Sequence, residues 1–99
     1  MPKYVLTLAA EEDLRNIFER TLEHWGPVRL TVLTESFESK FSILAKFPDT
    51  GRRHNKLAPH ILYAVGEAHY IFYKVIPEGI EIIRLLHHRM DVVRHLPRS

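Results

Sequence analysis

Two apolar series of helical spacing meet at the dipeptide Gly26-Pro27, and this pattern constrains the fold more than any other feature of the sequence. The first series runs from Leu14 to Trp25 and the second from Leu30 to Leu44, and in both an apolar side chain recurs every three or four positions. Such spacing predicts two helices, each with one apolar stripe. Because glycine and proline end a helix and the break is short, we expect an antiparallel helical hairpin, with Thr7 as its N-terminal cap.

Alternating apolar residues on both sides of the predicted hairpin indicate strands. Residues 3–8 form the first expected strand, and residues 61–65, 68–76 and 80–86 form a meander around turns at Gly66-Glu67 and 77–79. Residues 48–57 are predicted to be a polar loop, and Asp91 is expected to cap a short terminal helix. The fold class is therefore α+β, an antiparallel β-sheet packed against an N-terminal antiparallel helical hairpin. The order is β-α-α-β-β-β plus a short C-terminal helix, in a single domain of residues 1–99.

Several classes of function are disfavoured by what the sequence lacks. The chain has no cysteine, which excludes disulfides, thiol catalysis and cysteine-based zinc sites. It contains no glycine-rich phosphate loop and no H-E-x-x-H motif, and the adjacent His87 and His88 are expected to point to opposite faces of a strand. No metal and no cofactor are therefore expected. No apolar run reaches the roughly 18 residues that cross a bilayer, and the N-terminus does not resemble a signal peptide, so we expect a cytoplasmic protein without membrane association.

Basic residues gather in the second half of the chain. Residues 48–99 carry eight Lys/Arg against five Asp/Glu and six of the seven histidines, which favours an anionic partner. Alternation along the last strand places Arg84 with Leu86 and His88 on one face, and Ile83 with Leu85, His87 and Arg89 on the other. The candidate site residues are Arg52, Arg53, Arg84, His87 and Arg89. Arginine binds phosphate and histidine moves protons near neutral pH, so these residues suit metal-free RNA cleavage or binding of an acidic partner. Tyr70, Phe72 and Tyr73 are predicted to belong to the core and not to a base-stacking surface.

Five short segments, in order, resemble the ParE branch of the RelE/ParE toxin superfamily. They are T-L-A-A-E-E-D-L-R-N-I at residues 7–17, Phe47-Pro48 with Gly51-Arg52, Val65-Gly66, Ile71-Phe72-Tyr73, and the stretch from Gly79 through His87 and Arg89 to Asp91. The resemblance covers nearly the whole chain. It implies a type II toxin, in which a small sheet packs on a helical hairpin and an antitoxin wraps a helical segment over the toxin.

The resemblance also implies partners and alternatives. ParE-like members are linked to inhibition of DNA gyrase, and their antitoxins are typically of the ribbon-helix-helix type, so a hetero-oligomer with the antitoxin is expected. RelE-like members instead cut mRNA on the ribosome, and here such an endoribonuclease would use Arg52, Arg84, His87 and Arg89. Ile61 stands where many relatives carry an arginine that handles the scissile phosphate, which disfavours cleavage. The primary prediction is a gyrase-binding toxin that is not an enzyme; a non-toxic, antitoxin-binding relative is the third alternative. Trp25, Phe37 and Phe41 are the predicted antitoxin contacts.

Overall fold

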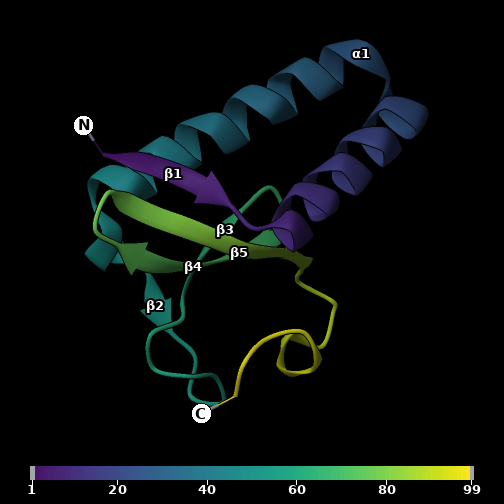
Figure 1. The fold of residues 1–99 in the computed structure, drawn as a ribbon. Helices are drawn as coiled ribbons and strands as arrows, with labels where there is room; N and C mark the ends of the chain where they lie inside the picture. The colour runs from purple at the N-terminus through teal and green to yellow at the C-terminus, as the bar shows by residue number, and fades with distance from the viewer. Residues whose placement is uncertain (1, 99) are drawn as a thin grey trace.

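The structure, a computed structural model, describes residues 2–98 and consists of a helical hairpin packed on one mixed sheet (Figure 1). The elements in chain order are β1 (Lys3–Leu6), α1 (Leu8–Lys46), the 3₁₀ turn η1 (Pro48–Thr50), β2 (Arg52–Arg53), β3 (Leu62–Gly66), β4 (His69–Ile76), β5 (Gly79–His87) and η2 (Val92–Arg94). The predicted α+β class and the order of its main elements are confirmed. Within residues 2–98, no helix combines the length and apolarity needed to cross a membrane.

The helical region α1 is a hairpin and not a straight rod, as Gly26-Pro27 predicts. Gly26 adopts a φ of 85°, a conformation that glycine reaches without steric cost, and the chain bends sharply there (Figure 1). A straight helix of 39 residues would be about 58 Å long at 1.5 Å per residue, whereas the longest dimension of the molecule is 38 Å. Thr7 caps the first arm, because its Oγ1 accepts a hydrogen bond from the Ala10 amide at 3.0 Å.

The strands follow the order β1-β5-β4-β3-β2. β3, β4 and β5 form the predicted antiparallel meander. The expectation of a wholly antiparallel sheet is wrong for β1, which pairs in parallel with β5. The helical hairpin lies between β1 and the other strands in sequence. A connection of this length allows β5 to pair with β1 in parallel, which a short turn cannot do. β2 forms within the segment predicted to be a loop, where Arg52 pairs with Tyr63 and Arg53 with Leu62.

Two apolar clusters cover the two faces of the sheet. The first lies between the sheet and the hairpin, and it buries the stripe of the second arm: Leu33, Phe37, Phe41 and Leu44. The second lies between the opposite face and the C-terminal segment, around Phe72, Leu86 and Val92. Phe72 and Tyr73 are buried in these two clusters, and Tyr70 packs against the second, which confirms their predicted place in the core.

A β-bulge in β5 changes the predicted alternation of its side chains. Phe72 pairs with Arg84 and Tyr73 with Ile82, so Ile83 is an extra residue in the ladder. Leu85 consequently packs in the hairpin-side cluster, while Ile83 packs against the other one. The sequence predicted that these two residues share a face, which is wrong, because a bulge shifts the phase of the pleat.

Candidate functional site

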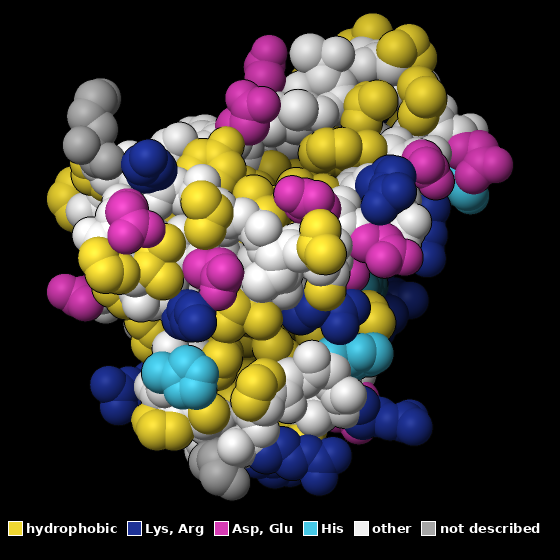
Figure 2. All heavy atoms as spheres, viewed as in Figure 1, with side chains coloured by type: hydrophobic (Ala, Val, Ile, Leu, Met, Phe, Trp, Pro, Cys, Tyr) yellow, Lys and Arg dark blue, Asp and Glu magenta, His cyan; other side chains and the backbone are white. Residues whose placement is uncertain are grey.

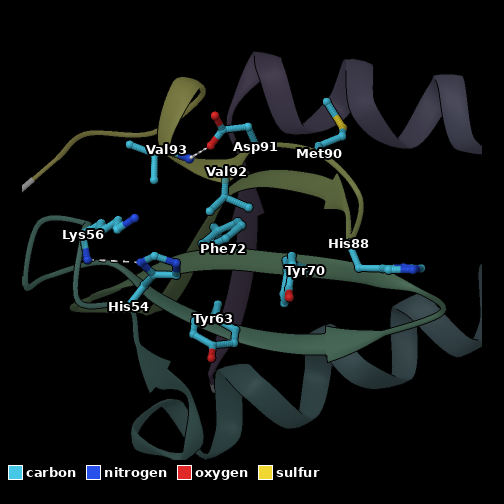
Figure 3. A pocket seen from close by; sticks show the side chains of 10 residues that line it. All are labelled: His54, Lys56, Tyr63, Tyr70, Phe72, His88, Met90, Asp91, Val92 and Val93. Carbon is cyan, nitrogen blue, oxygen red and sulfur yellow. Dashed lines mark hydrogen bonds between the residues drawn. The ribbon is translucent and has the colours of Figure 1, made fainter.

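A groove crosses the sheet face that lies away from the hairpin (Figure 3). We call it the sheet groove; its volume is about 370 Å³. The strands supply Tyr63, Tyr70 and Phe72, and the loop after β2 supplies His54 and Lys56. The C-terminal segment supplies the other wall: His88, Met90, Asp91, Val92 and Val93.

Hydrogen bonds and apolar contacts hold the C-terminal segment against the sheet, and its position forms one wall of the groove. Asp91 accepts a hydrogen bond from the Val93 amide at 3.2 Å and so caps η2, as predicted, although the element is a single 3₁₀ turn. Farther along, the Ala58 amide donates to the Pro97 carbonyl at 3.0 Å. Buried Val92 then packs on the sheet, which leaves the half-buried Val93 facing the groove.

Aromatic rings line the sheet side of the groove. Tyr63 and Tyr70 meet edge to face with ring centroids 5.5 Å apart, and each ring also lies within 6 Å of buried Phe72. Both tyrosines are only half-buried, and Figure 3 shows their side chains along the groove. His54, Lys56 and His88 add polar and basic groups at its rim. The arrangement suits binding of a partner with both apolar and anionic groups.

Arg52 and Arg53 are both exposed on β2, but they lie on opposite faces of the sheet. Arg52 pairs with Tyr63 and lines a second hollow of about 480 Å³ on the far side of the two tyrosines. Arg53 pairs with Leu62, which belongs to the hairpin-side cluster, and residues paired in this way share a face. Of the two predicted loop arginines, Arg52 is therefore the one beside the sheet groove.

Arg84 is engaged within the protein and does not join the other candidate residues. Its Nε and Nη2 donate to Asp13 Oδ2 and Oδ1 at 2.8 and 3.0 Å. The same carboxylate accepts from the Leu85 amide at 2.9 Å, so it satisfies the edge of β5 beyond the end of β1. The hydrogen bonds from Arg84 to Asp13 raise the pKa of the Arg84 guanidinium. The ion pair between Arg84 and Asp13 thus links β5 to the first arm of α1.

His87 lies at the end of β5, opposite His69 in the register of β4. Partial burial lowers the pKa of His87, and the positive charges of His88, His69, Arg89 and Arg20 lower it further. Arg89 follows as an exposed residue in the turn after β5. These two candidates lie together, whereas Arg52 is three strands away, at about 4.8 Å per step.

The predicted antitoxin contacts divide into one exposed and two buried residues. Trp25 is 75% exposed at the bend of the hairpin, but Phe37 and Phe41 are only 1% and 2% exposed. The burial of Phe37 and Phe41 argues against them as antitoxin contacts in this conformation, because their stripe faces the sheet. Exposed apolar residues instead gather at the far end of the hairpin (Figure 2). We call this the hairpin-tip patch; its members are Leu22, Trp25, Val28 and Val32.

Sequence reasoning missed the groove residues His54, Lys56, Tyr63 and Tyr70 as a group, and it missed the role of Asp13. The period-two spacing of Tyr70 and Phe72 on β4 was a usable signal, because it places both rings on one face. For Asp13 no local signal existed, since an acid in the first turns of a helix is expected in any case.

Comparison with known proteins supports the resemblance in the sequence. A family model described as the ParE toxin of the type II toxin–antitoxin system parDE matches residues 4–92. A relative named Toxin ParE1 from Mycobacterium tuberculosis is 32% identical, over 95% of this chain and 97% of its own length. Toxin ParE from Escherichia coli is 31% identical, over 97% of this chain and 94% of its own. The fold is also similar to a solved chain of a chromosomal ParDE system from P. aeruginosa, with a TM-score of 0.72 at 18% identity, covering 88% of this chain and 96% of the other.

Proposed function

Because this chain belongs to the ParE toxin family of type II toxin–antitoxin systems, we propose that it inhibits DNA gyrase by binding to it and not by catalysis. The observation that carries the proposal is the family match, which extends over residues 4–92 and so includes the hairpin, the sheet and the start of the C-terminal segment. Gyrase as the target is what the resemblance to ParE implies.

The arrangement of the candidate residues supports binding over cleavage. An endoribonuclease would need Arg52, Arg84, His87 and Arg89 to act on one phosphate, but Arg84 is held by Asp13 and Arg52 lies on the far edge strand. The target-binding residues that we propose are Arg52 and Arg53 at one edge of the sheet and His87 and Arg89 at the end of β5. Their charge suits an acidic surface and would speed association.

The antitoxin partner follows from membership in a toxin–antitoxin family. We propose that the antitoxin covers the hairpin-tip patch, with Trp25 as the main contact, because large exposed apolar patches commonly mark interfaces. A ribbon-helix-helix antitoxin, a hetero-oligomeric complex and action in the cytoplasm complete the proposal, and they come from the family resemblance.

A plasmid topology gel tests the gyrase proposal. Purified, antitoxin-free chain is titrated into gyrase, relaxed plasmid and ATP, and antitoxin is added back as a control. We expect blocked supercoiling or trapped cleaved plasmid, reversed by the antitoxin. Normal supercoiling at high toxin excess would refute the gyrase target. A ribosome-dependent mRNA cleavage assay would then separate the endoribonuclease from a non-toxic relative that retains antitoxin binding.

The double variant His87→Ala/Arg89→Ala tests the proposed target-binding surface. We expect it to reduce toxicity while the complex with the antitoxin survives, because both side chains lie outside the hairpin-tip patch. Growth assays with and without the antitoxin measure this, and Arg94→Ala is the matched control, an exposed arginine of the C-terminal segment. Unchanged growth arrest in the double variant would remove His87 and Arg89 from the surface.

A further inference from the structure

Three histidines pack against one another at one end of the sheet. His69 begins β4, His87 ends β5, and His88 follows directly. The rings of His69 and His87 are perpendicular with centroids 5.3 Å apart, and those of His87 and His88 lie 4.3 Å apart at 30°. The expectation that His87 and His88 point to opposite faces is therefore wrong, because β5 ends at His87 and His88 does not follow the alternation of the strand. The cluster meets the sheet groove at His88, which also lines that groove, while His69 contacts Phe37 of the hairpin-side core. The three imidazole rings therefore form one continuous cluster.

Backbone hydrogen bonds assign a hydrogen to one nitrogen of each ring. His69 Nδ1 lies 2.6 Å from the Glu67 carbonyl and His88 Nδ1 lies 3.0 Å from the Ala68 carbonyl. A carbonyl can only accept, so both Nδ1 atoms donate, and in the neutral rings Nε2 carries a lone pair. His87 is the reverse: its Nδ1 accepts from the Arg89 amide at 3.2 Å, so its Nε2 bears the hydrogen.

Two arginines add fixed positive charge to the histidines. Arg20 comes from the first arm of α1 and Arg89 from the turn after β5, and after burial and the neighbouring histidines their charges also lower the pKa of His87. Neither forms an ion pair within residues 2–98. Glu67 at the nearby turn does not neutralise them, because its carboxylate is engaged by Ser36 and Arg29. The basic cluster therefore consists of Arg20, His69, His87, His88 and Arg89.

We propose that the basic cluster binds a phosphate monoester group and that one proton is taken up on binding. Arg20, Arg89 and the His87 Nε2–H donate to phosphate oxygens, as these groups carry hydrogens at neutral pH. His69 and His88 present lone pairs at Nε2, so they favour a ligand that brings a hydrogen. A phosphate monoester, with a second pKa near 6, shares one proton with such an imidazole. A carboxylate is ionised at neutral pH and has no hydrogen to offer, so it fits less well.

The geometry disfavours a metal ion at this place. Although the Nε2 lone pairs of His69 and His88 resemble those of metal ligands, residues 2–98 hold no group of three or more His, Asp or Glu side chains arranged to bind a metal. A proton-linked anion site accounts for both the free arginines and the ring orientations.

Calorimetric titration of the isolated chain with inorganic phosphate, between pH 6 and 8, tests the proposal without reference to gyrase. We expect the dissociation constant to rise with pH and to approach a tenfold rise per pH unit at the upper end of this range, where the free phosphate has lost its second proton and one proton must come from solution. Repeating the titration in buffers of different ionisation enthalpy should give an uptake of about one proton. Phosphate binding without pH dependence, or acetate binding as tightly as phosphate, would overturn the proposal.

Matched variants locate the site. Arg20→Gln should weaken phosphate binding by about threefold or more, whereas Arg15→Gln, an equal loss of charge on the same arm, should not. His88→Gln should flatten the pH dependence, and His95→Gln, an exposed histidine outside the cluster, should leave it intact. Equal effects within each pair would overturn the assignment.

Oligonucleotides with a 5′-phosphate or a 5′-hydroxyl distinguish the sources of the phosphate. Tighter binding of the phosphorylated oligonucleotide than of inorganic phosphate supports a nucleic-acid end, and equal binding supports a free phosphate. Binding that does not need the 5′-phosphate would refute a monoester site.

Discussion

Replacement of Asp13 with alanine tests the view that one carboxylate joins the helical hairpin to the sheet. Asp13 accepts three hydrogen bonds, two from Arg84 and one from the Leu85 amide, between 2.8 and 3.0 Å. The side chains are 14% exposed for Asp13 and 23% exposed for Arg84, so the pair lies between an exposed ion pair and a fully buried one. Removing the carboxylate leaves a half-buried guanidinium and a strand amide without their acceptor.

The expected loss of stability follows from these partners. An exposed ion pair contributes about 0.2–1 kcal/mol, while breaking a buried pair costs about 3–5 kcal/mol. The Leu85 amide adds about 1–3 kcal/mol if it loses its acceptor inside the protein. Since water can reach part of this site, we expect Asp13→Ala to lower the free energy of unfolding by about 2–3 kcal/mol. For a domain of this size that corresponds to a Tm lower by roughly 10–20 °C.

Urea unfolding followed by far-UV circular dichroism measures the change, with the slope checked for two-state behaviour. Glu19→Ala is the control, because Glu19 is an exposed acid on the same arm and should change stability by less than about 0.5 kcal/mol. Asp13→Asn should fall between the two, since its amide oxygen can still accept from Leu85. A double-mutant cycle with Arg84→Met should give a coupling of about 1 kcal/mol or more. The reasoning fails if Asp13→Ala matches Glu19→Ala or if the coupling is zero.

Three further predictions concern the core, the histidines and a close contact. Phe37→Ala should destabilise the protein by about 3–5 kcal/mol in urea unfolding, whereas exposed Trp25→Ala should leave stability nearly unchanged and weaken antitoxin binding in a pull-down. The pKa of His87 in the folded state is lower than its ordinary value of 6.5, so the unfolded chain takes up the proton first as the pH falls. The free energy of unfolding, measured in urea, should therefore be constant above about pH 7 and decrease as the pH falls below 6.5. His87→Gln should make this decrease less steep. Gly51→Ala should lower the free energy of unfolding by about 1–3 kcal/mol in urea unfolding, because a Cβ there would collide with the Tyr73 hydroxyl and with two carbons of its ring. Tyr73→Phe should not rescue this variant, since the ring carbons remain and the hydrogen bond to the Pro48 carbonyl is lost.

The elements were predictable where the local pattern matches the tertiary environment. The stripe of the second arm keeps a helical period because one side of that arm faces the sheet, and Phe37 and Phe41 are at the centre of that contact. Thr7 and Asp91 were predicted as caps from side chains that bind amides two or three residues away, an interaction that is wholly local. The parallel pairing of β1 was not predictable in this way, because it joins residues more than seventy positions apart.

The candidate site was less predictable than the fold, since a residue's identity does not show whether its side chain is free. Arg84 and Arg89 are both arginines near the end of β5, yet Arg84 is bound by Asp13 while Arg89 has no ion pair within residues 2–98. Phe37 and Trp25 are both aromatic residues of the hairpin, but one faces the sheet and the other faces solvent. Charge and aromaticity in the sequence identified candidate residues but did not show which of their side chains are exposed and unpaired.

The sequence by itself determined the helical hairpin, the three-stranded meander and membership in a toxin family, because these depend on periodicity, turn residues and motif order along the chain. Only the tertiary structure decided which basic groups are available. It brings Asp13 from the first helical arm to the open edge of β5 and places the two tyrosines of neighbouring strands side by side in a groove. It also gathers three histidines at one end of the sheet, where the charge of Arg20 acts on His87. Such groupings join residues that are distant in sequence, and the free energy of each contact depends on burial and neighbours that no local pattern records.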